Sequence, residues 1–437
     1  MSGSSVRRAP LVPVTLRRAF RTYAPEPDAE HAISTETVVG YPFTSGGLEL
    51  EPEYKHLLRT RPVARITTPT GDPAWLVTGY EECRAVLGDA RFSRSAIAAP
   101  AGPRQQIPSV PPNAFNGMEM LRRTGEARAV LQHLRPRRIA IHRPWIEGLA
   151  EQLLDAMVRR GAPGDLVADY AAPFPLAVMC RVLGLETGRD GRPSYADEER
   201  LAYWSDVAFS MNSRDPTEIA ASWAELREYL AGEVARVRRD PGDGMLATLV
   251  AARDDHGSFS EDELLDTTAG LLVVGYKTLI SFLGLAAVAL LRHPEQAGRT
   301  AQDPVRLLPT AVEELLRYVL IENRGVARIA TERVRVGDVT VAAGELVVVA
   351  LHAADHDPGT FPDPGRLEAT RRDAEHLAFG HGEHFCPGSA LARLQIHCAL
   401  AALLPRLPAL RLAVPAEQLT WRDGLILRAP ATVPVTW

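Results

Sequence analysis

The sequence is poor in cysteine, with only four in 437 residues, too few and too scattered for a disulfide framework. A reducing compartment, the cytoplasm, is therefore expected. Three of them, Cys83, Cys180 and Cys398, lie in apolar helical sequence and are expected to be packing residues. The sequence also lacks a large excess of charge, since its net charge is −5, which gives it no general attraction to nucleic acid.

No continuous apolar run lies near the start of the sequence. Residues 1–35 are instead rich in arginine and proline. This composition is neither that of a signal peptide nor that of a membrane anchor, and it predicts a flexible N-terminal segment. Residues 36–437 hold no linker-like stretch, so we expect them to form a single domain.

One long apolar run does occur, over residues 269–291, and its length could span a bilayer. The polar residues at 276–278 interrupt its centre, where a charge in lipid is costly. Upstream, Ser260 and Glu263 have the spacing of a capping box, which predicts the start of a helix. The pattern therefore favours a long helix buried in protein, with a polar notch at residues 276–278.

Elsewhere the periodicity is mainly helical, with a smaller β region and no repeat of fixed period. Residues 94–117 hold five prolines and two glycines and are too long for a simple connection. We expect a lid or binding loop there, and a disordered excursion is the alternative. We also predict a β-hairpin from residues 62–68 and 74–78, a strand-rich stretch over 333–351, and helices within residues 80–88, 118–160 and 198–237.

The most informative stretch is Phe-Gly-His-Gly-Glu-His-Phe-Cys-Pro-Gly at residues 379–388. It places Cys386 in a glycine-rich loop directly before an apolar helix predicted from Ser389 to Leu404. Glycine lets the backbone turn tightly and approach a flat cofactor, and the N-terminus of a helix stabilises a thiolate. Such a loop suits an anionic sulfur that binds iron.

Two other interpretations of this stretch stay open from the residues alone. Cys386 could be a buried packing thiol. Alternatively, it could bind zinc together with His376, His381 and His384. Interspersed glycines and the lack of a second cysteine nearby disfavour zinc.

All six fixed positions of the cysteine loop of the cytochrome P450 family, Phe-Gly-x-Gly-x-His/Arg-x-Cys-x-Gly, are present here. The chain resembles that family over residues 62–437, in its soluble bacterial form. The resemblance implies a mainly α haem fold with a smaller β region, and one haem b whose iron is bound by Cys386. Phe379, Gly380 and Gly388 would form the loop beneath the haem. A thiolate ligand favours cleavage of the O–O bond.

Charged residues elsewhere follow the family's order along the chain. Glu314 and Arg317 form its Glu-x-x-Arg helix, and Arg366 lies in a later proline-rich segment. By resemblance these three form a buried charge triad that holds the cysteine loop. Arg328 and His384 would each contact a haem propionate.

A third propionate partner is expected from a His-Thr-x-x-Arg segment of the family. Arg123-Thr124 aligns with its beginning, and Ala127 stands where the arginine would be, with Arg128 next to it. Arg123 is therefore the candidate, and a solvated position is the alternative for both arginines.

The polar notch differs from the family pattern at one position. Family members carry Ala-Gly-x-Asp/Glu-Thr, where the glycine opens space for oxygen and the acid and threonine relay protons. This chain keeps Gly275 and Thr278, but Lys277 replaces the acid. A protonated lysine cannot accept a proton. Three outcomes are open: proton delivery by Thr278 with water or a substrate hydroxyl, diversion to coupling, dehydrogenation or peroxide-driven chemistry, or poor oxygen activation.

The resemblance implies a monooxygenase that hydroxylates or epoxidises a medium-to-large organic molecule, such as a polyketide or another secondary metabolite. Electrons would come from a ferredoxin or flavodoxin with its reductase, because the sequence has no flavin or iron–sulfur signature. We expect a monomer whose substrate is free or bound to a carrier protein. A non-catalytic haem-fold helper of a biosynthetic partner is the alternative from another class.

Two surfaces follow from this interpretation. The basic run over residues 135–143 is a candidate docking patch for the redox partner, with a solvated face as the alternative. The substrate site is expected to be lined by five segments: residues 94–117, 207–214, 274–278, 320–323 and 425–426.

Overall fold

The computed structural model describes residues 40–43, 47–99, 102–106, 112–188, 191–210, 214–319, 321–372 and 375–437. The predicted flexible segment at residues 1–35 lies outside this part of the chain. The described residues fall within one compact unit, Glu36–Trp437.

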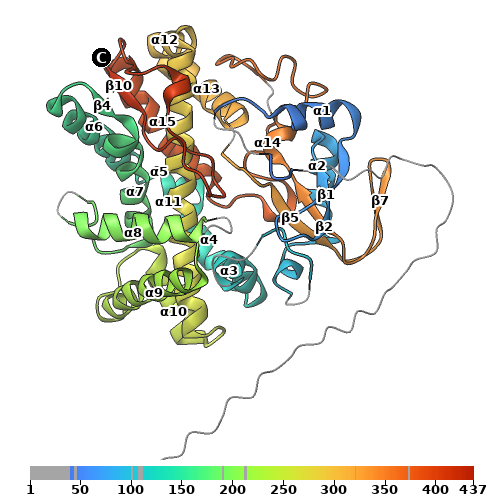
Figure 1. Ribbon diagram of the computed structural model, residues 1–437. Helices are drawn as coiled ribbons and strands as arrows, with labels where there is room; N and C mark the ends of the chain where they lie inside the picture. Colours follow the sequence, from blue (N-terminus) through green and yellow to red (C-terminus); the bar gives the residue numbers. More distant parts are fainter. Residues whose placement is uncertain are drawn as a thin grey trace, which may run out of the picture. The chain divides into compact units, whose positions relative to one another are not determined.

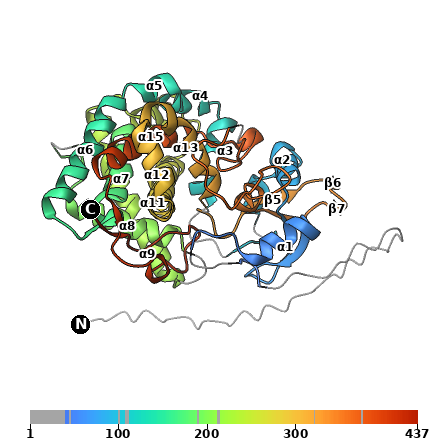
Figure 2. The same cartoon turned by 90° about the horizontal axis from the view of Figure 1, so that it is seen from above.

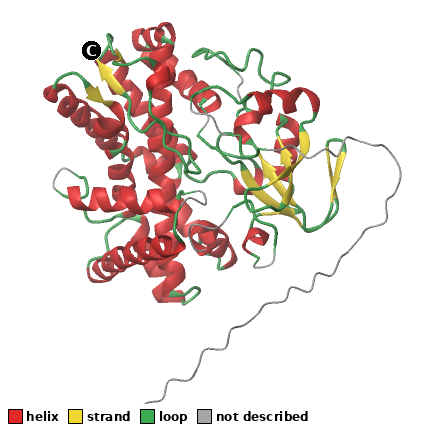
Figure 3. Cartoon of the chain, in the orientation of Figure 1, coloured by secondary structure: helices red, strands yellow, loops and turns green. Residues whose placement is uncertain are grey.

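Helices make up most of this unit and strands a smaller part, which confirms the predicted fold class (Figure 1, Figure 3). The helices are α1 (Pro52–Thr60), α2 (Tyr80–Gly88), α3 (Pro112–Arg123), α4 (Ala127–Leu131), α5 (Pro136–Ala140), α6 (Arg143–Arg160), α7 (Pro173–Leu183), α8 (Tyr195–Ala208), α9 (Pro216–Arg239), α10 (Met245–His256), α11 (Glu261–Arg292), α12 (Pro294–Gln302), α13 (Pro304–Tyr318), α14 (Leu351–Ala354) and α15 (Ser389–Arg406).

The predicted helices are present, and one boundary of the predicted loop is wrong. Residues 80–88 form α2, residues 118–160 fall mainly in α3 to α6, and residues 198–237 in α8 and α9. The loop expected over residues 94–117 ends earlier, because α3 already begins at Pro112. Proline is tolerated in the first turn of a helix, where its missing N–H would have no partner. Residues 107–111 of that loop lie outside the described residues.

The main sheet has five strands in the order β1-β2-β8-β5-β3. The predicted hairpin is confirmed as β1 (Val63–Thr67) and β2 (Pro73–Val77), which pair antiparallel, with Gly71 in the turn at a φ of 87°. The other strands of the sheet are β3 (Phe92–Ser93), β5 (Val326–Ala330) and β8 (Leu346–Val349). Two smaller sheets pair β6 (Val334–Val336) with β7 (Val339–Val341), and β4 (Gly164–Asp165) with β10 (Pro434–Thr436) and β9 (Arg411–Leu412).

Both faces of the main sheet are covered. Side chains alternate along a strand, so Trp75 and Val77 of β2 pack with α2, whereas Ala74 and Leu76 pack on the other face with α1. The larger apolar core lies among the helices and includes Cys180 and Cys398, while Cys83 is buried beside the sheet.

Helices α6 to α12 gather on one side of the unit and the main sheet lies on the other, as both views show (Figure 1, Figure 2).

The long helix α11 passes through the helical part and contacts α3, α7, α8, α9, α10 and α12 (Figure 1). It begins as predicted, because Ser260 accepts from the N–H of Glu263 while the Glu263 carboxylate accepts from the N–H of Ser260. Its length and composition would allow a membrane span, but 72% of its most apolar window is buried within the protein. This burial fits a core helix.

Candidate functional site

Cys386 lies where the helical part meets the sheet. The loop that carries it contacts α2 through a short 3-10 helix, Gly382–His384, and then enters α15. Gly380 and Gly382 have φ angles of 73° and 70°, which glycine adopts without strain. A side chain at Gly382 would also meet the carbonyl oxygen of Leu87 at 2.6 Å. Both glycines are therefore required by the path of the backbone.

Backbone and charged groups act together on the Cys386 sulfur. The N–H of Cys386 donates to the carbonyl of Phe379 at 2.9 Å and so closes the loop. Burial raises the pKa of the Cys386 thiol, and the N–H groups of Gly388 and Ser389 and the charge of Arg393 oppose that rise. A thiol that ligates a metal ion is deprotonated. The same groups would then stabilise the bound thiolate.

Beside the cysteine loop, cationic side chains converge on a small hollow. Arg122 of α3 donates to Nδ1 of His384 at 3.3 Å and to the carbonyl of Glu383 at 2.8 Å. Seven residues line the hollow: Arg94, Met118, Glu119, Arg122, His384, Phe385 and Pro387.

The excess of positive charge affects the pKa values around this hollow. Burial lowers the pKa of Arg328 to about 10, and the charge of Arg94 adds to that shift. Burial also lowers the pKa of His384, and Arg328 and Arg94 lower it further. Cations that destabilise one another in a partly buried place favour an anionic ligand. The two carboxylates of a haem would supply that charge, so the residues present fit the cofactor.

Arg123, the expected third propionate partner, does not reach this hollow. Its side chain is 74% exposed and lies 3.7 Å from Glu263. The preceding residue, Arg122, takes the position beside His384 instead. Neighbouring residues of a helix point in directions about 100° apart, so a shift of one residue decides which arginine faces the loop.

The Glu-x-x-Arg pair is fully buried. Glu314 and Arg317 are both 0% exposed, and two hydrogen bonds of 2.8 and 2.9 Å join them. Arg317 also donates to the carbonyls of Asp355 and Pro364 at 3.0 and 2.9 Å. The pair thus connects α13 to the chain that leads into the cysteine loop.

The predicted third member of this triad is wrong. The side chain of Arg366 is 67% exposed and pairs only with Glu368 among the described residues. Arg371 takes its place, because its Nε donates to Glu314 at 3.0 Å and its side chain is 14% exposed. Arg366 contributes its backbone carbonyl, which accepts from Arg317 and from Arg371.

The middle of α11 exposes one narrow face. Val274 is 39% exposed, and the hydroxyl of Thr278, one turn further on, is also exposed and donates to the Val274 carbonyl at 2.9 Å. Gly275 does not open space of its own, because a side chain there would meet the end of Met179 from α7 at 2.5 Å. Of the three predicted catalytic positions, Thr278 places its hydroxyl on this face, Gly275 is half-buried against Met179, and Lys277 is buried.

Lys277 points away from that face. Its ammonium pairs with Asp206 of α8, and the same carboxylate pairs with Arg422 near the end of the chain. The Lys277 side chain is only 5% exposed, and burial lowers its pKa while Asp206 opposes that shift. Lys277 therefore serves as an ion-pair partner between α11 and α8. Neither Asp206 nor Arg422 was identified from the sequence.

Three of the segments expected to line a substrate site lie side by side. Ser210 pairs with Leu425, and the N–H of Ile426 donates to the carbonyl of Phe209 at 2.7 Å. The N–H of Asn323 in turn donates to the carbonyl of Ile426 at 2.9 Å. Residues 211–213 and Leu320 of these segments lie outside the described residues.

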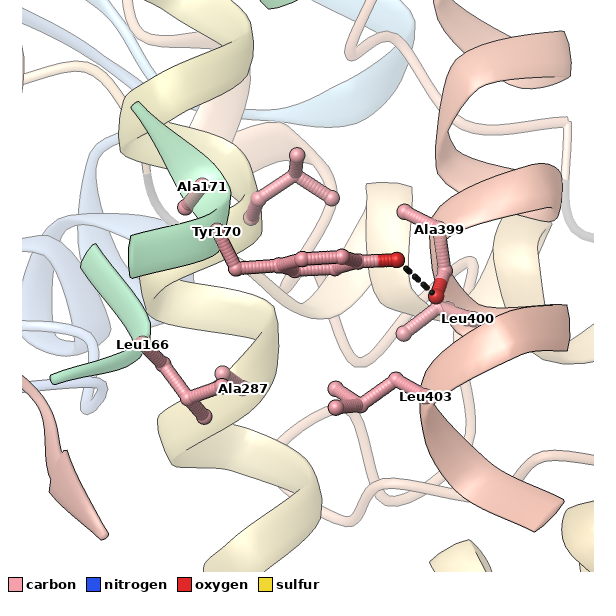
Figure 4. Close-up of a pocket in the computed structure, with 8 residues that line it drawn as sticks. Leu166, Tyr170, Ala171, Ala287, Ala399, Leu400 and Leu403 are labelled. Carbon is pink, nitrogen blue, oxygen red and sulfur yellow. Dashed lines mark hydrogen bonds between the residues drawn. The ribbon is translucent and has the colours of Figure 1, made fainter. Parts of the chain in front are cut away.

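A second small hollow lies in the helical core. Figure 4 shows it between Val167–Ala171, α11 and α15, where the Tyr170 hydroxyl donates to the Ala399 carbonyl at 2.8 Å. The other side chains that line it are alanine and leucine, so it is a packing space.

The zinc interpretation finds no support in the part of the chain that the structure describes. These residues contain no group of three or more histidine, cysteine or acidic side chains placed to hold a metal ion. His376 lies instead 3.1 Å from the Glu313 carboxylate.

Comparisons with known proteins agree with this geometry. The family model for cytochrome P450 matches residues 218–408. Nocardicin C N-oxygenase of Nocardia uniformis is 40% identical over 91% of this chain and 98% of its own length. Mycinamicin IV hydroxylase/epoxidase of Micromonospora griseorubida is 38% identical over the same shares. Among solved structures, the LnmA cytochrome P450 hydroxylase of the leinamycin pathway of Streptomyces atroolivaceus is 41% identical, with a TM-score of 0.80 over 91% of this chain and 99% of that one.

Proposed function

The chain belongs to the cytochrome P450 family, and from that premise we propose that it hydroxylates or epoxidises a medium-to-large organic molecule, such as a polyketide. Membership and the named oxygenases of secondary metabolism among its relatives, which match nearly the whole chain, make it a haem-dependent monooxygenase of secondary metabolism. A hydroxylase/epoxidase among those relatives supports oxidation at carbon.

Cys386 is the proposed axial ligand of a haem b. The single observation that carries this proposal is the position of Cys386 in a closed loop at the N-terminus of α15, next to a cationic hollow. Phe379, Gly380 and Gly388 would shape the loop, and Arg328 with His384 would hold the propionates. Haem bound through a thiolate supplies the activation of O₂.

Proton delivery is the proposed task of Thr278. Its hydroxyl lies on the exposed face of α11, and it already donates to a backbone carbonyl, so its oxygen is free to accept from water or a substrate hydroxyl. The ammonium of Lys277 is engaged by Asp206 and has no lone pair to accept a proton. The proposed relay therefore runs through Thr278 with water or a substrate hydroxyl and does not include residue 277.

The electrons would come from a separate ferredoxin or flavodoxin with its reductase. The basic run over residues 135–143 offers a surface for such a partner, because Arg135, Arg137 and Arg138 are exposed. We also propose that the protein is a cytoplasmic monomer whose substrate is either free or bound to a carrier protein.

The carbon monoxide complex of the reduced protein tests the axial ligand. Wild type should show the red-shifted Soret band of a thiolate complex, and Cys386→Ser should lose it. Cys398→Ser removes a buried cysteine of α15 and should leave the band in place. A histidine-type band in wild type, or an unchanged band in Cys386→Ser, would contradict the assignment.

The role of Thr278 is tested by the coupling of electrons to product. Thr278→Ala should lower the product formed per reduced nicotinamide consumed by about 10²-fold, the lower end of the contribution of a general acid or base. Thr268→Ala is the matched control, because Thr268 makes the same bond to the carbonyl four residues earlier but is fully buried. Coupling that survives Thr278→Ala would exclude the relay.

Product analysis with labelled O₂, and assays with peroxide in place of O₂ and electrons, separate the alternative functions. Coupling or dehydrogenation chemistry would consume O₂ and electrons without placing labelled oxygen in the product, and peroxide would replace both electrons and O₂ in a peroxide-driven enzyme. A helper protein would form no product with any redox partner.

A further inference from the structure

A charged layer lies directly behind the cysteine loop. Arg393 of α15 donates through Nε and Nη2 to the two oxygens of Glu313 from α13, at 2.7 and 2.8 Å. The guanidinium carbon of Arg393 lies 4.6 Å from the centre of the Phe379 ring, within the range of a cation–π contact. Glu313 therefore holds a cation against the aromatic residue that begins the loop.

His376 completes this layer. The N–H of Ala378 donates to Nδ1 of His376 at 3.2 Å, and Nε2 of His376 lies 3.1 Å from the Glu313 carboxylate. Hydrogen bonds from His376 and Arg393 outweigh burial and lower the pKa of Glu313 to about 2. Glu313 is therefore the anion that holds both His376 and Arg393.

Phe379 connects Arg393 to Cys386. Its ring contacts the Arg393 guanidinium, and its carbonyl accepts the N–H of Cys386 at 2.9 Å. Arg393 therefore places a positive charge behind the loop that carries the sulfur, and Glu313 offsets that charge by pairing with it.

We propose that the Glu313–Arg393 pair is a positioning element that sets how much negative charge the Cys386 sulfur donates to the iron, and hence the reduction potential of the haem. The inference rests on the proposed haem-thiolate function. The electron comes from the redox partner, and the pair changes only the free energy of accepting it. An uncompensated cation favours the reduced state and an uncompensated anion the oxidised state.

The two single variants should therefore shift the potential in opposite directions. Glu313→Gln leaves the Arg393 charge uncompensated and should make the potential more positive. Arg393→Gln leaves the Glu313 charge and should make it more negative. The double variant should return towards the wild-type value, and Arg393→Lys, which keeps the charge, should lie near it. A purely structural role would move both single variants in the same direction or abolish haem binding.

The experiment is a redox titration of each haem-loaded variant, with the carbon monoxide spectrum recorded on the same samples. Arg406→Gln, on the same helix but paired with the remote Glu151 and Asp155, should shift neither. If wild type lacks the thiolate band, the proposed function fails. If wild type shows the band and the two variants shift together or not at all, the tuning role alone is overturned. Since the Arg393 side chain is 36% exposed, its Gln and Lys variants keep the test available should Glu313→Gln fail to fold.

Discussion

Replacing Glu314 with alanine should destabilise the protein by about 3–5 kcal/mol, the cost typical of removing one partner of a buried ion pair. Glu314 is fully buried and accepts hydrogen bonds from Arg317, Arg371 and the N–H of Glu368. Its loss leaves two guanidinium groups without a counter-charge, one of them entirely shielded from water. Urea unfolding of the purified protein, together with the fraction that retains haem, measures the effect.

Two arginine variants test the composition of this triad. Arg371→Ala should cost a large part of the same free energy, because Arg371 contacts Glu314 and is 14% exposed. Arg366→Ala should cost less than about 1 kcal/mol, the usual value of an exposed pair. An Arg366 variant as unstable as the Arg371 variant would restore the triad expected from the sequence.

This correction illustrates what the sequence could not determine. The Glu-x-x-Arg spacing within one helix was sufficient to identify Glu314 and Arg317, because residues three apart share a helix face. The third arginine lies in irregular chain, where no period relates sequence position to direction. Asp363 adopts a φ of 46° three residues before Arg366, whose side chain lies at the surface, whereas Arg371 contacts Glu314.

The cysteine loop was predictable for the opposite reason. Gly380 and Gly382 are needed for backbone conformations that other residues rarely adopt, so the motif carries its own geometry. The prediction of Arg123 rests on aligning Arg123-Thr124 with the beginning of the family's His-Thr-x-x-Arg segment. That alignment does not determine which face of α3 each residue occupies, and an alignment error of one residue exchanges Arg122 at the loop for the solvated Arg123.

The notch in α11 shows a third limit. The sequence identifies Lys277 as a departure from the family pattern, but not the partner that accommodates it. Asp206 and Arg422 are distant from Lys277 in the sequence. Only the folded chain brings the two cations, Lys277 and Arg422, to the carboxylate of Asp206. The position that departs from the family pattern therefore joins α11 to α8 in this chain.

Asp206→Asn should be much more costly than Lys277→Met. Among the described residues, the carboxylate of Asp206 is the one anion paired with both cations, and its removal leaves Lys277, which is 5% exposed, without a counter-charge from them. About 3–5 kcal/mol is expected for that loss. Lys277→Met leaves Asp206 paired with Arg422, and replacing a buried cation by an apolar side chain of similar length should change stability by only about 1 kcal/mol. Urea unfolding of both variants gives the comparison.

The double variant decides whether the two residues act as a pair. Because Arg422 is 35% exposed and can be solvated, Asp206→Asn combined with Lys277→Met should recover most of the stability that Asp206→Asn loses. Lys277→Glu places a second carboxylate against Asp206 and should be more costly than Lys277→Met. The thiolate band of the carbon monoxide complex should persist in every variant that folds. Lys277 faces α8 and lies away from the exposed face of α11 that carries the Thr278 hydroxyl. Equal losses from Asp206→Asn and from the double variant would mean that the buried ammonium is not what Asp206 stabilises.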